Sequence, residues 1–596
     1  MSVLPFLAVA FGFSAASLLL RRRPPASVAV GLVGLVASIG AAMFIQPDEL
    51  AIAGGSIAGS DYGRLFLLLG TWTSLGLVLI GLATSLPRNL AGTLLAGLGA
   101  AGLALSLPDP TTAVIAAIAG GLAGILITLR DEPTGEGVAV ATRELRAIVV
   151  AGALVLLATA WMSRPLGSLA DDPAVFGLAY VAVAIGVAMR FGAIPFHLWA
   201  ARVADAAPEI GLPLLMAWGP AALAVVALAW IDSSIVPVLP ISGDLPAERA
   251  IVIAIGLACL VLGAIAAWIQ DDLEHVVGYA TVQDAGIVIL AFAALDPDVW
   301  PASRTWIIVL LAARTAFAAW AVVVRARFGT RHIDDLDGWA RRSPVLGVAL
   351  AGIAIASVGW PGLAAYEARA DVIRFAVDGP IQTLSLLAVF LPLLYYGRLF
   401  VVGLARPGEA IAAVPDDRPR RVTLALRPVT GPSPTTGPGP ETDRVPATGR
   451  TARLPSAQSI RDSLGTVGPL VDANRGLLIG LLALVLAGTA VVTAGGGFGL
   501  PAAAAESAPG SADQPRDVIG PGENPSPSPS LAPGPNPSES PAPTVSPAPS
   551  SSDTPAQTES PQPTPAPTAV PSASSGASPG GSSPAPSPTA ATPSAS

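Results

Sequence analysis

A short stretch in the middle of the chain places a cation, a proline and a histidine inside an apolar run. Residues 190–199 read Arg-Phe-Gly-Ala-Ile-Pro-Phe-His-Leu-Trp, so Arg190 precedes Pro195 by five residues and His197 follows it by two. A charge at membrane depth is expensive and is usually kept for function. A proline there breaks a helix and frees backbone groups that can line an ion path. The stretch predicts such a path, with Arg190 snorkelling to the membrane surface as the alternative.

Opposite charges also occur in two later apolar segments that follow each other. Asp284 lies in the first and Arg314 in the second. Two opposite charges inside a membrane cost less when paired than apart, so we expect Asp284 and Arg314 to interact. Arginine keeps its proton even when buried. A carboxylate such as Asp284 is therefore the kind of group that could carry a proton here.

A third group of charges follows Pro361. Glu367, Arg369 and Asp371 occur at every second position, and we expect them to form a local charge cluster buried in the bundle. The cluster either belongs to an ion path or is a structural salt bridge. In the second case, Asp371 could simply neutralise Arg374, which is three residues away on the same helix.

The composition shows which elements must position these side chains. The chain has 596 residues, of which only 12% are charged, and a mean hydropathy of +0.63. Apolar runs long enough to span a bilayer recur along the chain. We predict an all-α polytopic membrane protein with about fourteen transmembrane helices. Its predicted spans are 3–20, 26–46, 64–85, 89–106, 111–129, 146–163, 173–194, 209–231, 249–269, 275–295, 303–324, 344–377, 380–404 and 476–497.

Arginines are unevenly distributed between the loops that join these spans. Cytoplasmic loops carry the excess of positive charge, so loops after odd-numbered spans are predicted to be cytoplasmic and both chain ends extracytoplasmic. The first span is not expected to be a cleavable signal, because its arginines follow it. The odd-numbered side holds Arg21, Arg22, Arg23, Arg88, Arg130, Arg143, Arg146, Arg202, Arg325, Arg327, Arg331, Arg341 and Arg342, against Arg64, Arg164, Arg249 and Arg304 on the other.

Two long polar segments interrupt or follow the apolar runs. Residues 405–475 contain many arginines and prolines and are predicted to be a disordered cytoplasmic linker. Residues 502–596 are rich in Pro, Ser, Ala and Thr and nearly lack aromatic residues, so they cannot bury a core. We therefore divide the chain into a membrane core (1–404), the linker, a last helix (476–497) and a disordered extracytoplasmic tail.

Few residues are suited to redox or metal chemistry. The single cysteine, Cys259, excludes a disulfide within the chain and an iron–sulfur site. His197, His275 and His332 are too scattered to indicate a metal site, and Glu274 with His275 is expected at the membrane edge. No flavin or dinucleotide motif is present. We expect no cofactor in this chain, no bound metal and no nucleic-acid partner.

Several motifs recur in a fixed order across the later spans. They are Arg190 to Trp199 with Asp-Ala-Ala-Pro at 205–208; Asp-Leu-Glu-His-Val-Val-Gly-Tyr-Ala-Thr-Val-Gln-Asp-Ala-Gly at 272–286; Asp-Leu-Asp-Gly-Trp-Ala-Arg-Arg-Ser-Pro at 335–344, continuing through Gly-Trp-Pro-Gly at 359–362 to Arg369; and Tyr-Tyr-Gly-Arg at 395–398.

Their order and spacing resemble the proton-antiporter-like membrane subunits of respiratory complex I and of the multi-subunit cation/proton antiporters. The details are most similar to the subunit N branch of the bacterial NADH–quinone oxidoreductases. The resemblance implies two inverted repeats of five helices, spans four to eight and nine to thirteen, each with one broken helix. Here the breaks are expected near Pro195 and Pro361. It also implies a buried chain of charged residues that relays protons.

The sequence departs from that family where the relay would lie. The two lysines of the broken helices correspond to Arg190 and Arg369. The fifth span, 111–129, lacks the family's glutamate, and the family's eighth-span lysine would fall near Pro220, where no titratable residue stands. If the chain conducts protons, Arg190 and Arg369 are expected to be fixed charges. The titratable candidates are then His197, Asp284, Glu367 and Asp371.

Three functions remain open on these grounds. The first is a membrane subunit of an NADH–quinone oxidoreductase-like complex that couples quinone reduction to proton translocation, with redox chemistry in partner subunits. The second is a subunit of a cation/proton antiporter or of a membrane-bound hydrogenase. The third is a diverged scaffold that keeps the fold and does not conduct. Each places the chain in a bacterial-type plasma membrane, in the lipid bilayer, beside other membrane subunits.

Overall fold

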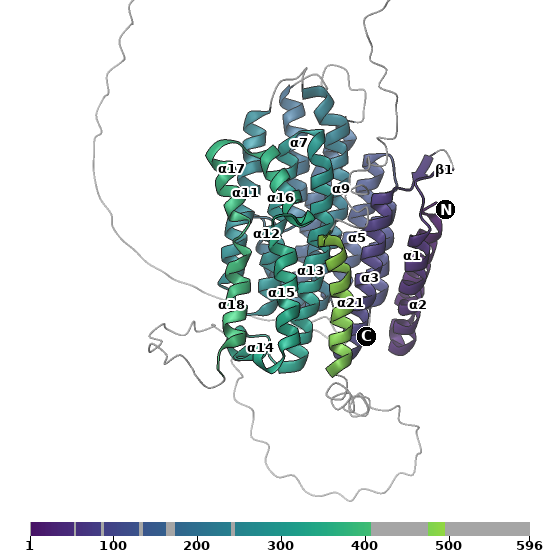
Figure 1. The fold of residues 1–596 in the computed structure, drawn as a ribbon. Coiled ribbons are helices and arrows are strands. Elements are labelled where there is room, and N and C mark those ends of the chain that lie inside the picture. The colour runs from purple at the N-terminus through teal and green to yellow at the C-terminus, as the bar shows by residue number, and fades with distance from the viewer. Residues whose placement is uncertain are drawn as a thin grey trace, which may run out of the picture. The chain divides into compact units, whose positions relative to one another are not determined.

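The computed structural model describes residues 2–52, 55–84, 89–129, 135–162, 173–239, 245–406 and 475–494. These residues form a bundle of helices that run roughly parallel to one another, with a single small hairpin (Figure 1). The predicted linker, except for residues 405, 406 and 475, and the predicted tail lie outside the described residues.

Long apolar runs make helices the dominant element, because a helix satisfies its own backbone hydrogen bonds in lipid. The first half of the bundle contains α1 (Leu4–Leu19), α2 (Pro24–Met43), α3 (Asp61–Thr84), α4 (Leu90–Ala104), α5 (Pro110–Leu129), α6 (Gly135–Met162), α7 (Pro173–Arg190), α8 (Leu198–Ala206) and α9 (Gly219–Trp230).

The second half of the bundle is also built from helices. It contains α11 (Pro246–Trp268), α12 (Leu273–Ala294), α13 (Trp300–Phe328), α14 (Trp339–Arg342), α15 (Pro344–Val358), α16 (Ala364–Ala376), α17 (Gly379–Ala388), α18 (Pro392–Leu404) and α21 (Arg475–Ala494).

Short elements join these helices. Strands β1 (Glu49–Ile52) and β2 (Gly55–Ala58) pair antiparallel with Glu49 opposite Ala58. Two π-helical turns, η4 (Leu214–Trp218) and η5 (Ile231–Ile235), flank α9. The remaining 3₁₀ turns are η1 (Leu20–Arg22), η3 (Glu209–Gly211), η6 (Val236–Val238), η7 (Pro297–Val299) and η8 (Ile333–Leu336).

Each of the fourteen predicted spans contains an apolar helix among the described residues. Ten helices or helix pairs are long and apolar enough to cross a membrane. The other four predicted spans contain shorter apolar helices, Leu90–Ala104, Val175–Arg190, Pro344–Val358 and Leu478–Ala490. The prediction of an all-α polytopic membrane protein is confirmed.

Two of the helices are broken where prolines predict it. α7 ends at Arg190 and α8 begins at Leu198, with Pro195 in the irregular segment between them. α15 ends at Val358 and α16 begins at Ala364, with Pro361 between them. Gly359 turns the chain at the second break with φ +70°, and a Cβ there would lie 2.9 Å from the Tyr366 nitrogen. Glycine is therefore needed at this turn.

The breaks occupy matching places in two sets of five spans. The first set is α4, α5, α6, α7 with α8, and α9; the second is α11, α12, α13, α15 with α16, and α17 with α18. The broken member is the fourth in each set, as predicted. Because five spans are an odd number, consecutive sets start on opposite sides of the membrane and are inverted relative to each other.

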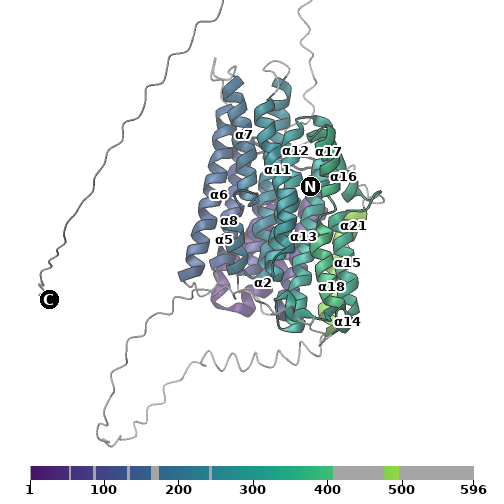
Figure 2. The ribbon, with the colours of Figure 1, turned by 90° about the vertical axis from the view of Figure 1, so that its left-hand side faces the viewer.

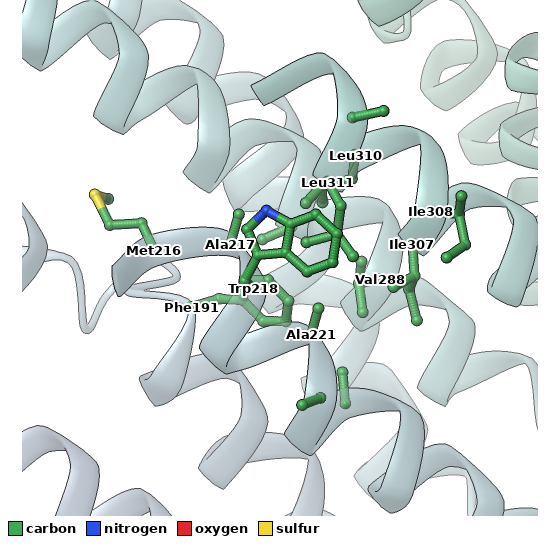
Figure 3. Close-up of a cluster of buried hydrophobic side chains, with 14 of the residues drawn as sticks. Phe191, Met216, Ala217, Trp218, Ala221, Val288, Ile307, Ile308, Leu310 and Leu311 are labelled. Carbon is green, nitrogen blue, oxygen red and sulfur yellow. The ribbon is translucent and has the colours of Figure 1, made fainter. Parts of the chain in front are cut away.

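A dry apolar cluster joins the two sets (Figure 3). Trp218 lies at its centre, with Phe191 and Met216 on one side and Leu310 and Leu311 of α13 on the other. The Trp218 Nε1 donates to Thr315 Oγ1 at 3.0 Å, which satisfies the one polar atom of the indole. This packing fixes the position of η4 and α9, which matter for the first charge centre described below.

The last helix, α21, lies against α3, α13 and α15, far along the chain from all three (Figure 1). Trp72 Nε1 donates to the Leu484 carbonyl at 3.0 Å, and Thr489 Oγ1 donates to the Ala312 carbonyl at 3.1 Å. α21 thus connects α3, which precedes the first set of five spans, to members of the second set.

Candidate functional site: two buried charge centres

The first centre surrounds Arg190, the last residue of α7. Its side chain is only 3% exposed, and Nη1 donates to the Leu215 carbonyl at 3.0 Å. Leu215 lies in the π-helical turn η4, whose altered hydrogen bonding is typical of functional positions in helices. The guanidinium points into the bundle, so the alternative that Arg190 snorkels to the membrane surface is wrong.

Two glycines on neighbouring helices make room for this guanidinium. A Cβ added at Gly219 would lie 2.7 Å from Arg190 Nη2, and one added at Gly121 would lie 3.1 Å from the same atom. Gly121 belongs to the fifth predicted span, which lacks the family's glutamate, and Gly219 adjoins Pro220, where the family's lysine would fall. The arginine therefore extends into the space that is free of side chains at both positions.

The carboxylate near Arg190 comes from α6. Glu144 is 0% exposed, its Oε2 accepts from Thr128 Oγ1 at 2.6 Å, and it interacts electrostatically with Arg190. Sequence reasoning missed Glu144, because the predicted sixth span began at residue 146. α6 in fact starts at Gly135, and the helical continuation of an apolar face back through Ala141 and Val140 could have signalled a buried Glu144.

His197 lies on the other side of the first break. It precedes α8, and its ring lies 6.3 Å from that of Tyr279 on α12, measured between centroids. A cavity of about 10 Å³ lies between α8 and α12, lined by His197, His275 and Tyr279 among others. A cavity of this size is at the lower limit for holding one water molecule. His197 therefore faces α12, whereas the Arg190 guanidinium faces α5 and α9.

The second centre contains the predicted ion pair. Arg314 Nε and Nη2 both contact Asp284 Oδ2 at 2.6 Å, and each side chain is 1% exposed. Arg314 also donates to the hydroxyls of Tyr395 and Tyr396, at 3.4 Å in each case. The interaction of Asp284 with Arg314 is confirmed. Charge-assisted bonds of this kind are what make a buried pair tolerable.

Arg369 lies beside that pair and is 0% exposed. Its guanidinium carbon lies 4.7 Å from the centroid of the Trp306 ring, and Trp306 Nε1 in turn donates to the Asp284 carbonyl at 3.1 Å. None of the three guanidinium nitrogens has a hydrogen-bond partner among the described residues. Arg369 interacts electrostatically with Asp284 and with Arg314. The centre therefore contains two cations and one carboxylate.

Glu367 and Asp371 do not join this centre. The Glu367 side chain is exposed and accepts from the Gly362 nitrogen at 3.2 Å, at the start of α16. Asp371 is half-exposed and pairs with Arg374 at 2.8 Å. The expected buried cluster of three charges is wrong, because helical geometry turns Arg369 about 200° away from Glu367 while Asp371 returns to the same face as Glu367. The alternative pairing of Asp371 with Arg374 is confirmed.

A third group of charges lies at the end of the bundle near α14. Arg331 pairs with Glu274, and Arg325 pairs with Glu209 of η3. Asp272, Glu274 and His275 have ligand-type atoms within 4.8 Å of one another. Arg331 and His332 contact two of these acids directly, so the group is an ion-pair network that ties the loop after α13 to α12.

The described residues thus form a multi-pass helical membrane protein with two broken helices and buried charges near each break. Residues 171–394, which contain Arg190, Asp284, Arg314 and Arg369, match the family described as NADH:quinone oxidoreductase/Mrp antiporter, transmembrane region. Over these residues the chain is similar to this family of antiporter-like membrane subunits.

Individual relatives are similar over part of the chain. NADH-quinone oxidoreductase subunit N of Hydrogenovibrio crunogenus is 26% identical over 247 residues, which are 40% of this chain and 50% of that protein. Subunit N 1 of Streptomyces griseus is 27% identical over 251 residues, 41% of this chain and 51% of that one. The chain thus spans about half the length of the curated relatives it matches.

Solved structures support the fold. A chain of respiratory complex I from Thermus thermophilus gives a TM-score of 0.54 at 20% identity, covering 68% of this chain and 91% of that one. A chain of an Mrp complex from Dietzia sp. gives a TM-score of 0.56 at 21% identity, covering 67% of this chain and 46% of that one. A chain of an archaeal membrane-bound sulfane sulfur reductase gives a TM-score of 0.58 at 15% identity, covering 84% of this chain and 99% of that one.

Proposed function

We propose that this chain is a membrane subunit of an NADH–quinone oxidoreductase-like complex and that it moves protons across a bacterial-type plasma membrane. The match of residues 171–394 to the family model supports the proposal, as do the names of the relatives to which the chain is similar. Redox chemistry would reside in partner subunits, because the sequence holds no flavin, iron–sulfur or dinucleotide motif. The chain itself would contribute the membrane path and no cofactor.

The observation that carries the proposal is the second charge centre. A fully buried cation without hydrogen-bond partners among the described residues is costly, and proteins keep such groups in membranes mainly for function. Arg314 and Arg369 stay protonated, so they act as fixed charges. Asp284 is the group in this centre that can bind and release a proton, and the two arginines stabilise its ionised form. His197 and the first centre would extend the path along the membrane.

A second candidate is a subunit of a cation/proton antiporter or of another membrane-bound respiratory complex. The Mrp complex and the sulfane sulfur reductase share the fold at least as closely as complex I does. Partner subunits distinguish these candidates. Purification of the chain from its native membrane with its associated proteins should recover redox subunits in the first case and antiporter subunits in the second.

We also propose an orientation and a division of the chain. Arginines gather at the end of the bundle where α14 lies (Figure 1), and there Arg398 donates to the Trp268 carbonyl at 2.8 Å at the end of α11. The positive-inside rule makes this the cytoplasmic end. The segment 405–475 would then be a cytoplasmic linker, and both chain ends, including the tail 502–596, would be extracytoplasmic. Protease added to intact spheroplasts should remove the tail, whereas protection would reverse the orientation.

Proton flux tests the proposed function. The purified chain with its associated subunits is placed in liposomes that contain a pH-sensitive dye, and a membrane potential is imposed. We expect proton entry above that of empty liposomes, and a loss of most of it in Asp284→Asn. Wild-type flux equal to that of empty liposomes would instead favour the third alternative, a non-conducting scaffold.

A further inference from the structure

In the first centre, the cation and the carboxylate differ in how firmly they are held. The Arg190 guanidinium donates to the Leu215 carbonyl and fills the space between Gly121 and Gly219. Since even a Cβ at Gly219 would lie 2.7 Å from Arg190 Nη2, the guanidinium is packed tightly against α9. Arg190 is therefore fixed in position as well as in charge.

Glu144 is held by one oxygen only. Oε2 accepts from Thr128, while Oε1 has no hydrogen-bond partner among the described residues. The side chain is completely buried, and an ionised carboxylate there depends on a nearby cation. Arg190 on α7 is that cation. The neighbouring Arg143 and Arg146 on α6 are exposed and so lie on the other face of the helix.

The elements around this pair are adjacent in space. α5, α6, α7 and α8 lie together on one side of the bundle (Figure 2), and α5 packs against both α6 and α9. α5 contributes both Gly121 and Thr128, which lie about two helical turns apart. A single helix therefore contacts both the cation and the carboxylate. A shift of α5 would change both contacts at once.

We propose that Glu144 is the proton-binding residue of the first half, and that Arg190, seated between Gly121 and Gly219, is a positioning residue that stabilises its ionised form. The inference rests on the proposed function. The step is a simple proton transfer: the Glu144 carboxylate accepts a proton from water on one side and releases it to water on the other. The proton acceptor of this half is thus a carboxylate on α6, and the cation of the broken helix keeps its proton throughout.

The first test changes the carboxylate in the full chain with its associated subunits, in dye-loaded liposomes. We expect Glu144→Gln to lower the initial rate of proton entry by about tenfold or more, because an amide cannot carry the proton. Glu144→Asp should restore part of the rate. Thr128→Val keeps the shape of the side chain and serves as a milder variant should Glu144→Gln fail to insert. We expect it to lower the rate by about twofold or more, since Oε2 loses its donor.

The second test moves the cation without touching the carboxylate. Gly219→Ala should displace the guanidinium and shift the pH profile of proton entry toward higher pH, because the ionised carboxylate loses the buried cation that stabilises it. Gly352→Ala on α15 is the matched control, since a Cβ there meets nothing within 4 Å. A profile that is the same in Gly219→Ala and in wild type would show that Arg190 has no positioning role.

Difference infrared spectroscopy of the same preparations separates this inference from the proposed function. Wild-type protein should show a carboxyl band that appears on acidification and is missing in Glu144→Gln. If wild type conducts but Glu144→Gln conducts equally well and keeps the band, the inference fails while the proposed function stands. If wild type does not conduct, the proposed function fails, and absence of the band would overturn the inference as well.

Discussion

The two charge centres solve the problem of a buried arginine in different ways. In the first, Arg190 has a carbonyl acceptor, a space made by two glycines, and Glu144 on the adjacent helix. In the second, Arg369 rests on the face of Trp306 with no hydrogen bond to a described residue, while Arg314 takes the carboxylate of Asp284. The first centre balances one cation with one carboxylate; the second has one cation in excess.

The difference indicates where each centre has freedom to change. The first is held by its backbone contact and by close packing, so its fixed partner is the arginine and its adjustable partner is the carboxylate. In the second, a single carboxylate lies near two cations, and Tyr395 and Tyr396 provide Arg314 with other acceptors. Arg314 therefore has hydrogen-bond acceptors besides Asp284. The following changes test this comparison.

The largest loss of folding stability is expected from Asp284→Asn. It leaves two buried cations without a carboxylate, and removal of one partner of a buried ion pair typically costs about 3–5 kcal/mol. The double change with Arg314→Gln should be less damaging than Asp284→Asn alone, because it removes one of the cations. Thermal unfolding of the purified variants in detergent measures the stability loss of the single variant and of the double variant. Strict additivity of the two losses would show that the residues do not interact energetically.

The two broken-helix arginines should respond unequally to the same substitution. Arg190→Gln leaves Glu144 without its cation and the Leu215 carbonyl without its donor, so a loss of about 2–4 kcal/mol is expected. Arg369→Gln gives up the contact with Trp306, worth about 1–2 kcal/mol, and the attraction to Asp284, but it also relieves the repulsion with Arg314. Unfolding midpoints of the two variants compare them directly. Equal destabilisation would contradict the difference between the centres.

A smaller effect is expected from Tyr396→Phe. The Tyr396 hydroxyl contacts Ser357 at 2.8 Å and accepts from Arg314 at 3.4 Å. Loss of these bonds should cost about 1 kcal/mol, because Tyr395 still offers Arg314 an acceptor. The same unfolding assay applies, and combination with Asp284→Asn should cost more than the sum of the two, since Arg314 then loses two acceptors together. An additive result would remove Tyr396 from the second centre.

The smallest loss of folding stability is expected from Trp72→Phe, a change outside both charge centres. Trp72→Phe removes the hydrogen bond to the Leu484 carbonyl that joins α3 to α21. The loss should be about 0.5–1.5 kcal/mol, and proton flux should be unchanged. A large loss of flux in Trp72→Phe would mean that the position of α21 affects the path as much as the charges do.

Much of the fold could be read from the sequence because a membrane imposes strong rules. Span length, charge exclusion and proline breaks located the helices, and the cost of unpaired charge predicted the contact between Asp284 and Arg314. The surroundings of Arg190 could not be predicted. The role of Gly121 and Gly219 depends on which face of each helix meets α7, and small residues are common throughout these helices.

Two errors had readable causes. The predicted sixth span omits Glu144, because one carboxylate near a polar helix end lowers the local hydropathy even when the helix continues. The predicted charge cluster groups Glu367 with Arg369 by proximity in sequence, although the helical period places them on opposite faces. Periodicity would have separated them. It would not have shown that Arg369 faces Trp306, because that contact depends on how α13 and α16 pack.

The central claim is that a carboxylate at the second centre carries the proton while arginines supply fixed charge. The most direct test compares Asp284→Asn with Asp371→Asn, since Asp371 is also near the second break but is half-exposed and paired with Arg374. In liposomes that contain the chain and its associated subunits, Asp284→Asn should abolish most proton entry and Asp371→Asn should leave it at the wild-type rate. Equal flux in wild type, Asp284→Asn and Asp371→Asn would contradict the account.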